Sequence, residues 1–227
     1  MATDSPTSGI GREHGQSLTD QVFHALKDQV LRSQLRPGSV VIEGDLAERF
    51  GVSKTPIREA LRLLVQDGWI EVMPRRGYLV RPIGLDDLRE VYELRRILES
   101  GVVRKVIEKM NPQTVATLNG LIDEQATAGD SLEASIDASR DFHLSLARLT
   151  GNERLERSLA VLLDEVERLL RMLPELVALM TSSSEIEAHR KLVAALEDHD
   201  TDLAESLMLA HLADISRSLL EALGGIE

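Results

Sequence analysis

Three histidines stand where a helical core would normally hold apolar side chains. At spacings of three or four residues His143 stands in series with Ile136 and Leu146, and His189 and His211 occupy similar apolar series. A single histidine in such a series is usually an ordinary core residue. Three imidazoles on three different predicted helices are costly to bury together unless a metal ion or a bound anion partners them. The three histidines are therefore candidate metal ligands.

Two further polar residues interrupt the apolar series of the predicted helix that begins at residue 85. Arg95 and Glu99 are four residues apart, so they face the same side of that helix. The pair can be a partly buried salt bridge. Alternatively, the planar guanidinium of Arg95 can bind a carboxylate of a small ligand. With Ser139, which lies one helical turn before His143, these residues are candidates for binding an effector.

Residues 36–81 indicate a different chemistry. Their pattern predicts a short amphipathic helix from Glu43 to Phe50, a tight turn at Gly51–Ser53 and a second helix from about Lys54 to Asp67. Two short strand-like runs follow, at residues 69–73 and 78–81. Helix, turn, helix and hairpin together predict a winged helix-turn-helix, which places its second helix in the DNA major groove.

Basic side chains gather on that second helix and on the hairpin. Lys54, Arg58 and Arg62 lie opposite the apolar series of the helix, and Arg75 and Arg76 occupy the hairpin turn. A charged helix face is often only a solvated surface. Here the charged face starts at the helix N-terminus and is followed by a basic hairpin, which favours DNA binding.

The segment LRPGSVVIEGDLAERFGVSKTPIREALRLLVQDGWIEVMPRRG (35–77) closely resembles the DNA-binding domain of GntR-family bacterial transcription regulators. The resemblance implies contacts to DNA from the start of the recognition helix and from a wing tip that enters the minor groove. Lys54 stands where arginine is more usual in the family, and lysine lacks the planar fork that reads guanine. Together with Arg62 from the charge pattern, the candidate DNA-binding residues are Ser53, Lys54, Thr55, Arg58, Arg62, Arg75, Arg76 and Gly77.

The C-terminal part resembles the helical, FCD-like ligand-binding domain of the FadR-type branch of the same family. The matching segments are ELRRILES (93–100), FHLSLARLTGN (142–152) and EAHRKLVAALEDHDTDLAESLMLAHL (187–212). Many members of this branch bind a divalent metal through one aspartate and three histidines. The resemblance implies that His143, His189 and His211 are the histidine ligands, that Ser139 replaces the aspartate, and that Arg95 contacts effector carboxylates.

Two kinds of pocket are compatible with these residues. Three neutral imidazoles, completed by water or effector, can hold one divalent ion, Zn²⁺ or Ni²⁺. The alternative is a metal-free pocket in which the histidines bind an organic acid directly.

Composition and charge limit the class of protein. The 227 residues suit two modest domains, and the absence of cysteine excludes disulfides and thiolate metal sites. Residues 1–84 contain 11 Lys and Arg against 10 Asp and Glu, whereas residues 85–227 contain 15 against 28. The net charge of −12 therefore does not exclude DNA binding, because local positive charge is what neutralises phosphates.

The predicted protein is mainly α and has four parts. We expect a disordered tail at 1–17, a winged helix DNA-binding domain at 18–81, a linker at 82–84, and a bundle of six or seven helices at 85–223 for effector binding and dimerisation. No apolar run approaches the ~20 residues that span a bilayer, and no secretory signal is evident. We expect a cytoplasmic protein with no membrane partner.

The combined pattern favours a one-component transcription regulator and not an enzyme. By resemblance it is expected to be a repressor. Because one winged domain reads only a few base pairs, we expect it to bind a short palindromic operator in double-stranded DNA as a homodimer. A small carboxylate metabolite in the helical domain is expected to control that binding. A metal-responsive sensor is one alternative. A three-histidine metal-dependent hydrolase is another, although it would leave the winged domain without a role.

Overall fold

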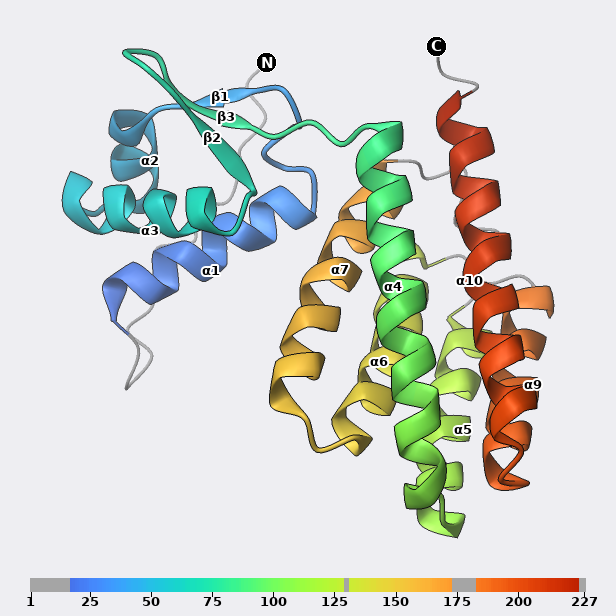
Figure 1. Cartoon of the computed structure of the whole chain (residues 1–227). Helices are drawn as coiled ribbons and strands as arrows, with labels where there is room; N and C mark the ends of the chain where they lie inside the picture. The colour runs from blue at the N-terminus through green and yellow to red at the C-terminus, as the bar shows by residue number, and fades with distance from the viewer. Residues whose placement is uncertain (1–16, 129–130, 173–182, 225–227) are drawn as a thin grey trace. The chain divides into compact units, whose positions relative to one another are not determined.

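The computed structural model describes residues 17–128, 131–172 and 183–224, which form two compact units divided at residues 83 and 84. The tail expected at 1–17 lies outside the described residues except for Ser17. Over the described residues the chain is mainly helical with one small sheet, which confirms the predicted fold class (Figure 1).

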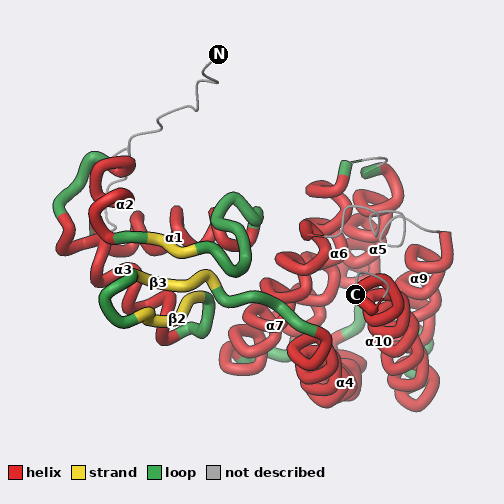
Figure 2. The backbone as a smooth tube through the Cα atoms, turned by 90° about the horizontal axis from the view of Figure 1, so that it is seen from above, coloured by secondary structure: helices red, strands yellow, loops and turns green. Residues whose placement is uncertain are grey.

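The first unit combines three helices with a three-stranded antiparallel sheet of order β1-β3-β2 (Figure 2). Its helices are α1 (Leu18–Leu31), α2 (Glu43–Phe50) and α3 (Lys54–Gln66). Its strands are β1 (Val40–Val41), β2 (Ile70–Met73) and β3 (Gly77–Val80). This is the predicted winged helix-turn-helix order.

Local signals set the element boundaries of this unit. The Ser17 hydroxyl and the Asp20 carboxylate form a reciprocal capping box that starts α1. Gly51 ends α2 at a φ of 66°, a left-handed conformation that glycine adopts without strain. The apolar faces of the helices meet around fully buried Leu26, Ile57 and Leu64. The opposite face of α3 is thereby left in solvent.

The second unit is a helical bundle. Its described helices are α4 (Leu85–Val106), α5 (Pro112–Thr127), α6 (Leu132–Leu149), α7 (Glu153–Met172), α9 (Ser183–Glu197) and α10 (Thr201–Gly224), with a 3₁₀ turn at Ile107–Lys109. In Figure 1 the long helices α4 and α10 lie side by side, and α4 also packs on α6 and α7. Helix α5 packs on α6 and α9. Polar side chains from several helices can therefore meet inside the bundle.

Two chain breaks predicted from sequence are present in the bundle. Asn111 caps α5 by accepting hydrogen bonds from the backbone N–H groups of Gln113 and Thr114, and Pro112 occupies the first helical turn. Gly151, at a φ of 67°, separates α6 from α7. These breaks fix where each helix starts, and so which of its residues face inward.

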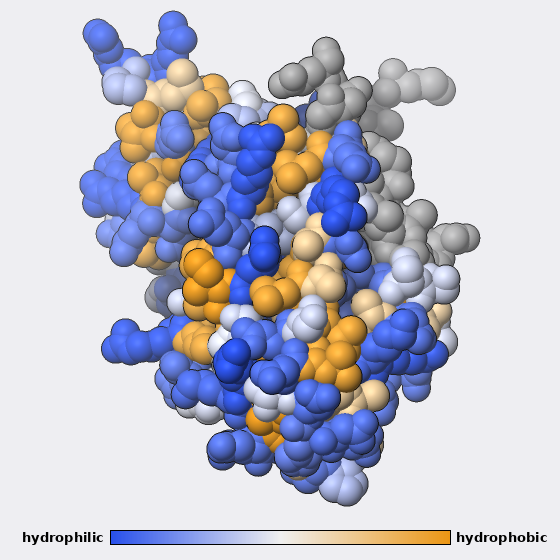
Figure 3. Space-filling view, turned by 45° about the vertical axis from the view of Figure 1, so that its right-hand side comes forward, coloured by the Kyte–Doolittle hydropathy of each residue, from blue (hydrophilic) through white to orange (hydrophobic). Residues whose placement is uncertain are grey.

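The face drawn in Figure 3 is mostly hydrophilic, with apolar areas between the charged ones. Large apolar side chains left exposed in the bundle include Leu94 and Ile97 on α4, Val161 on α7 and Leu203 on α10. In the described part of the chain, no helix is both long and apolar enough to cross a membrane.

Candidate DNA interface and metal centre

The start of α3 carries the predicted recognition surface. Lys54, Arg58 and Arg62 follow at four-residue intervals and are all exposed, so they form one stripe along the helix. Ser53 and Thr55 are exposed beside the first of them. Ser53 occupies the N-cap position in an extended conformation, but its hydroxyl makes no capping hydrogen bond. All five residues are exposed, and Ser53, Lys54 and Thr55 lie together at the start of the helix.

The wing is the turn between β2 and β3. Arg75 and Arg76 are exposed there, and Arg75 has a φ of 65°. Gly77 opens β3 at a φ of 114°, where a Cβ atom would lie only 2.4 Å from the Val41 carbonyl oxygen. Only glycine fits this close approach of β3 to β1. Gly77 therefore allows β3 to pair closely with β1 at the point where the wing begins.

Arg58 is held from outside its own helix. The Glu43 carboxylate on α2 accepts from Arg58 Nε at 3.1 Å and from Nη2 at 2.8 Å, and the Tyr78 hydroxyl on β3 also donates to it at 3.1 Å. The hydrogen bond from Arg58 is the main cause that lowers the pKa of Glu43. The three residues connect α2, α3 and the sheet.

Inside the bundle, the three predicted histidines converge. His143 comes from α6, His189 from α9 and His211 from α10, and all three are buried. One ring nitrogen from each lies within 4.8 Å of those of the other two. The Nε2 atoms of His143 and His211 are 3.3 Å apart, and Phe142 stacks on the His189 ring at 4.1 Å between centroids.

Each imidazole is held at Nδ1 by an acceptor oxygen. The partner of His143 is Glu99 Oε2 at 2.5 Å, and the partner of His189 is Gln125 Oε1 at 3.0 Å. The partner of His211 is Glu185 Oε2 at 3.3 Å. Because a carboxylate or amide oxygen accepts a hydrogen bond, the Nδ1 atoms of His143 and His189 carry the proton. The Nε2 lone pairs are then left for another partner, which is the usual arrangement of histidine metal ligands.

Burial reinforces this protonation state. It lowers the pKa of His143, against the opposing effect of Glu99, and lowers the pKa of His189 well below its usual value. Burial alone would raise the pKa of Glu99, but Arg95 and His143 outweigh it and lower that pKa to about 2. Arg95 Nε donates to Glu99 Oε1 at 2.7 Å, so the predicted salt bridge is present.

The cluster fits a divalent cation. Within the described residues, the buried His189 Nε2 makes no hydrogen bond; Glu185 Oε1 lies 3.6 Å from it. Two ligands at about 2.0–2.1 Å from a tetrahedral zinc are about 3.4 Å apart. The 3.3 Å spacing of the His143 and His211 Nε2 atoms is close to that value.

A cavity of about 30 Å³ adjoins the cluster. Its polar wall consists of Tyr92, Arg95, Ser139, Arg140, His143, Glu167, Glu185 and His211. Apolar side chains complete it: Ile136, Leu163, Val166, Leu170 and Ile215. Among the described residues Glu99 and His189 are not part of the wall. Glu99 instead contacts two residues of the wall, Arg95 and His143, and its place among the candidate effector-binding residues stays a prediction.

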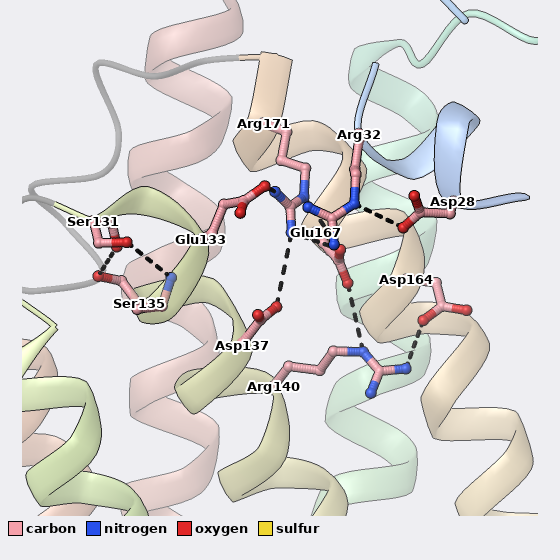
Figure 4. Close-up of polar contacts among 11 residues, drawn as sticks. Asp28, Arg32, Ser131, Glu133, Ser135, Asp137, Arg140, Asp164, Glu167 and Arg171 are labelled. Atoms are coloured by element: carbon pink, nitrogen blue, oxygen red, sulfur yellow. Dashed lines mark hydrogen bonds and ion pairs between the residues drawn. The ribbon is translucent and has the colours of Figure 1, made fainter. Parts of the chain in front are cut away.

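A chain of ion pairs, called here the ionic ladder, joins α6 and α7 (Figure 4), and two of its members, Arg140 and Glu167, line the cavity. Arg140 contacts Asp164 at 2.6 Å and Glu167 at 3.6 Å. Arg171 contacts Glu167 and, from α6, Glu133, each at 3.0 Å. Glu167 is therefore shared between two guanidinium groups. The ladder fixes the two helices relative to each other at the cavity.

Comparison with known proteins identifies the chain. Residues 18–80 match the family of bacterial regulatory proteins called gntR, and residues 90–214 match the FCD domain. The chain is a GntR-family transcription regulator.

Relatives of this GntR regulator match it over most of their length. It is 32% identical to the transcriptional regulator McbR of Escherichia coli K12, over 86% of this chain and 89% of McbR. It is 28% identical to a probable D-xylose utilization operon transcriptional repressor of Paenarthrobacter nicotinovorans, over 93% and 92%. The solved structure of E. coli McbR/YncC superimposes with a TM-score of 0.77 at 29% identity, covering 91% of this chain and 98% of that one. These relatives are regulators and not enzymes, which decides against the hydrolase.

The GntR regulator contains functional candidates that sequence reasoning missed. Glu185 and Gln125 hold two of the histidines, Glu43 holds Arg58, and Tyr92 and Arg140 line the cavity. Glu185 lies one helical turn before His189, so the sequence already indicated that the two residues are on the same side of their helix. Gln125 is 64 residues from its partner and gave no such signal.

Proposed function

We propose that this regulator is a repressor that binds a short palindromic operator. A small organic acid, bound beside a metal ion in the FCD domain, controls that binding. The observation that carries the proposal is the convergence of three buried imidazoles whose Nδ1 atoms are all engaged. Imidazole nitrogens that converge inside an apolar bundle are costly to bury without a partner, and a divalent cation between them would supply one.

In this proposal His143, His189 and His211 hold a divalent ion, Zn²⁺ or Ni²⁺. When bound, that ion supplies a Lewis-acidic site for an effector carboxylate. Ser139 brings a short hydroxyl to the place where the resemblance implies an aspartate, so a ligand position stays open to the effector. Arg95 in the cavity wall adds a guanidinium for the same carboxylate.

The DNA half of the proposal places the stripe of α3 in the major groove and the Arg75–Gly77 wing in the minor groove. The description of one relative as a probable repressor supports the sign of regulation. A palindromic operator requires a symmetric protein, and exposed Leu94 and Ile97 on α4 supply apolar surface for a homodimer.

Metal analysis tests the central step. Purified protein should contain about one divalent ion per chain, and His211→Ala should abolish that content. The matched control is His199→Ala, because His199 is exposed and contacts only a backbone carbonyl in the described structure. Chelation of the wild type should weaken the release of DNA by organic acids.

The outcomes separate the alternatives. If His143→Ala and His211→Ala change neither metal content nor effector response, the three histidines are ordinary core residues and the proposal fails. Release of DNA by metal alone, with no further effect of organic acids, identifies a metal-responsive sensor instead.

A further inference from the structure

The bidentate contact between Arg58 and Glu43 leaves one edge of the guanidinium unused. Glu43 engages Nε and one N–H of Nη2, which is the side edge of the group. A guanidinium has five N–H donors. Both N–H groups of Nη1 and one of Nη2 remain, and within the described residues Nη1 makes no hydrogen bond. The remaining donors form the end edge, the pair that matches guanine O6 and N7.

The contact also fixes where that free edge points. The Glu43 side chain is 21% exposed, whereas that of Arg58 is 50% exposed. The carboxylate is thus the more sheltered partner, and the guanidinium is the one that reaches solvent. Glu43 is itself anchored by the Tyr78 hydroxyl from β3, so the position of Arg58 is set by α2 and the sheet as well as by α3.

Holding Arg58 in advance reduces the cost of reading DNA. A free arginine side chain loses rotamer entropy when it binds a base, and part of that loss is avoided when the side chain is already held in place. The surroundings keep the carboxylate charged, because Arg58, Tyr78 and Lys54 lower the pKa of Glu43 against the opposing effect of burial. A charged acceptor gives the stronger type of hydrogen bond.

We propose that Glu43 is a positioning and specificity-determining residue, which clamps the side edge of Arg58 so that its end edge reads one guanine in each half of the operator. The inference rests on the proposed contact between Arg58 and DNA. It assigns a role in base recognition to an acidic residue that by charge alone would oppose DNA binding.

The simpler view of Glu43 predicts the opposite sign. An acidic residue close to the phosphates should repel DNA, so its neutralisation should strengthen binding to every sequence. If Glu43 acts through Arg58, neutralisation should strengthen non-specific binding but weaken binding to the operator. The two effects are separable because phosphate contacts carry no direct sequence information.

The test uses the full-length protein and an operator duplex selected by the wild type from a random DNA library. Glu43→Gln should weaken binding to that duplex roughly tenfold, the effect of losing one good bidentate contact. Binding to a shuffled duplex of the same length should stay equal or become tighter. Glu59→Gln, on α3, is the matched control for charge, because in the described structure its carboxylate is bonded to Thr19 and not to Arg58.

Replacing operator guanines one at a time with 7-deazaguanine removes the N7 acceptor and locates the contact. The wild type should lose affinity at one guanine in each half-site, and that loss should disappear in both Arg58→Ala and Glu43→Gln. Glu43→Asp keeps the charge but shortens the side chain. In this variant too, the affinity loss caused by 7-deazaguanine should disappear. This second variant keeps the test valid if Glu43→Gln does not fold.

The result also separates the two proposals. If Arg58→Ala keeps every 7-deazaguanine penalty of the wild type, the proposed Arg58 contact is wrong. If Arg58→Ala loses a penalty that both Glu43 variants keep, the DNA contact stands and the role of Glu43 is overturned. Tighter binding of Glu43→Gln to the operator would likewise overturn it.

Discussion

The carboxylate of Glu99 holds two buried side chains at once. It accepts from Arg95 Nε at 2.7 Å and from His143 Nδ1 at 2.5 Å, and all three side chains are almost inaccessible to solvent. Removing one partner of a buried ion pair leaves an uncompensated charge. Glu99 is therefore a structural residue for Arg95 and an orienting residue for His143, without facing the cavity itself.

We predict that Glu99→Ala lowers the free energy of unfolding by about 3–5 kcal/mol, because Arg95 would remain buried without its counter-charge. Urea denaturation followed by circular dichroism measures the change. Glu93→Ala on the same helix is the control: Glu93 is exposed, and its loss should stay within about 0.5 kcal/mol. Equal stability of the two variants would contradict the buried pair.

At the scale of elements, the wing depends on how closely two strands approach each other. Val41 of β1 pairs with Tyr78 of β3, and the backbone of Gly77 passes directly beside the Val41 carbonyl. A methyl group there would meet backbone, which cannot move aside as a flexible side chain can. The sheet would have to open where it carries the wing arginines.

Gly77→Ala should therefore destabilise the winged unit by roughly 1–3 kcal/mol and weaken DNA binding, since it combines a strained φ with a steric clash. Thermal unfolding and a DNA-binding titration measure the two effects. Gly44→Ala is the matched control in the same unit. Gly44 lies in helix α2, and an added Cβ would meet only the end of the Lys54 side chain at 4.0 Å. If Gly77→Ala melts at the same temperature as the wild type, the close approach of Gly77 to the Val41 carbonyl is contradicted.

Ion pairs join two helices of the bundle at the cavity border, in addition to their apolar contacts. Arg140 and Arg171 alternate with acidic residues of α6 and α7, and Glu167 is common to both (Figure 4). Burial raises the pKa of Glu167, and the two arginines oppose that effect. The relative position of α6 and α7 is thus coupled to the groups that line the cavity.

For the whole molecule, the proposed palindromic operator implies a homodimer. Ile97 and Leu94 are 63% and 44% exposed and lie one turn apart on α4, so together they offer apolar surface to a second copy. We predict that the full chain is a dimer at micromolar concentration in light scattering. Ile97→Glu should shift it toward monomer.

Leu203→Glu is the control for that experiment, because Leu203 is similarly exposed but lies on α10. It introduces the same charge and should leave the dimer intact. A wild type that scatters as a monomer would remove the symmetric partner from the proposed DNA complex. A dimer that both variants preserve would place the interface elsewhere on the surface.

The sequence by itself determined the elements and their order. Helix starts and stops follow from local chemistry: glycine at positive φ after α2, an asparagine cap with proline before α5, and a glycine between α6 and α7. Periodicity also showed that three histidines face inward on separate helices. These features depend on neighbours within four residues, so the sequence contains all the information they need.

Only the tertiary structure decided which inward faces meet. Glu99 and His143 are 44 residues apart, Gln125 and His189 are 64 apart, and no local pattern pairs them. The same holds for Glu43 and Arg58, which are 15 residues apart on two different helices. Periodicity gives the face of a helix but not the helix that packs on it. The partner that fixes a ring nitrogen or a guanidinium edge is therefore set by packing between helices far apart in the chain.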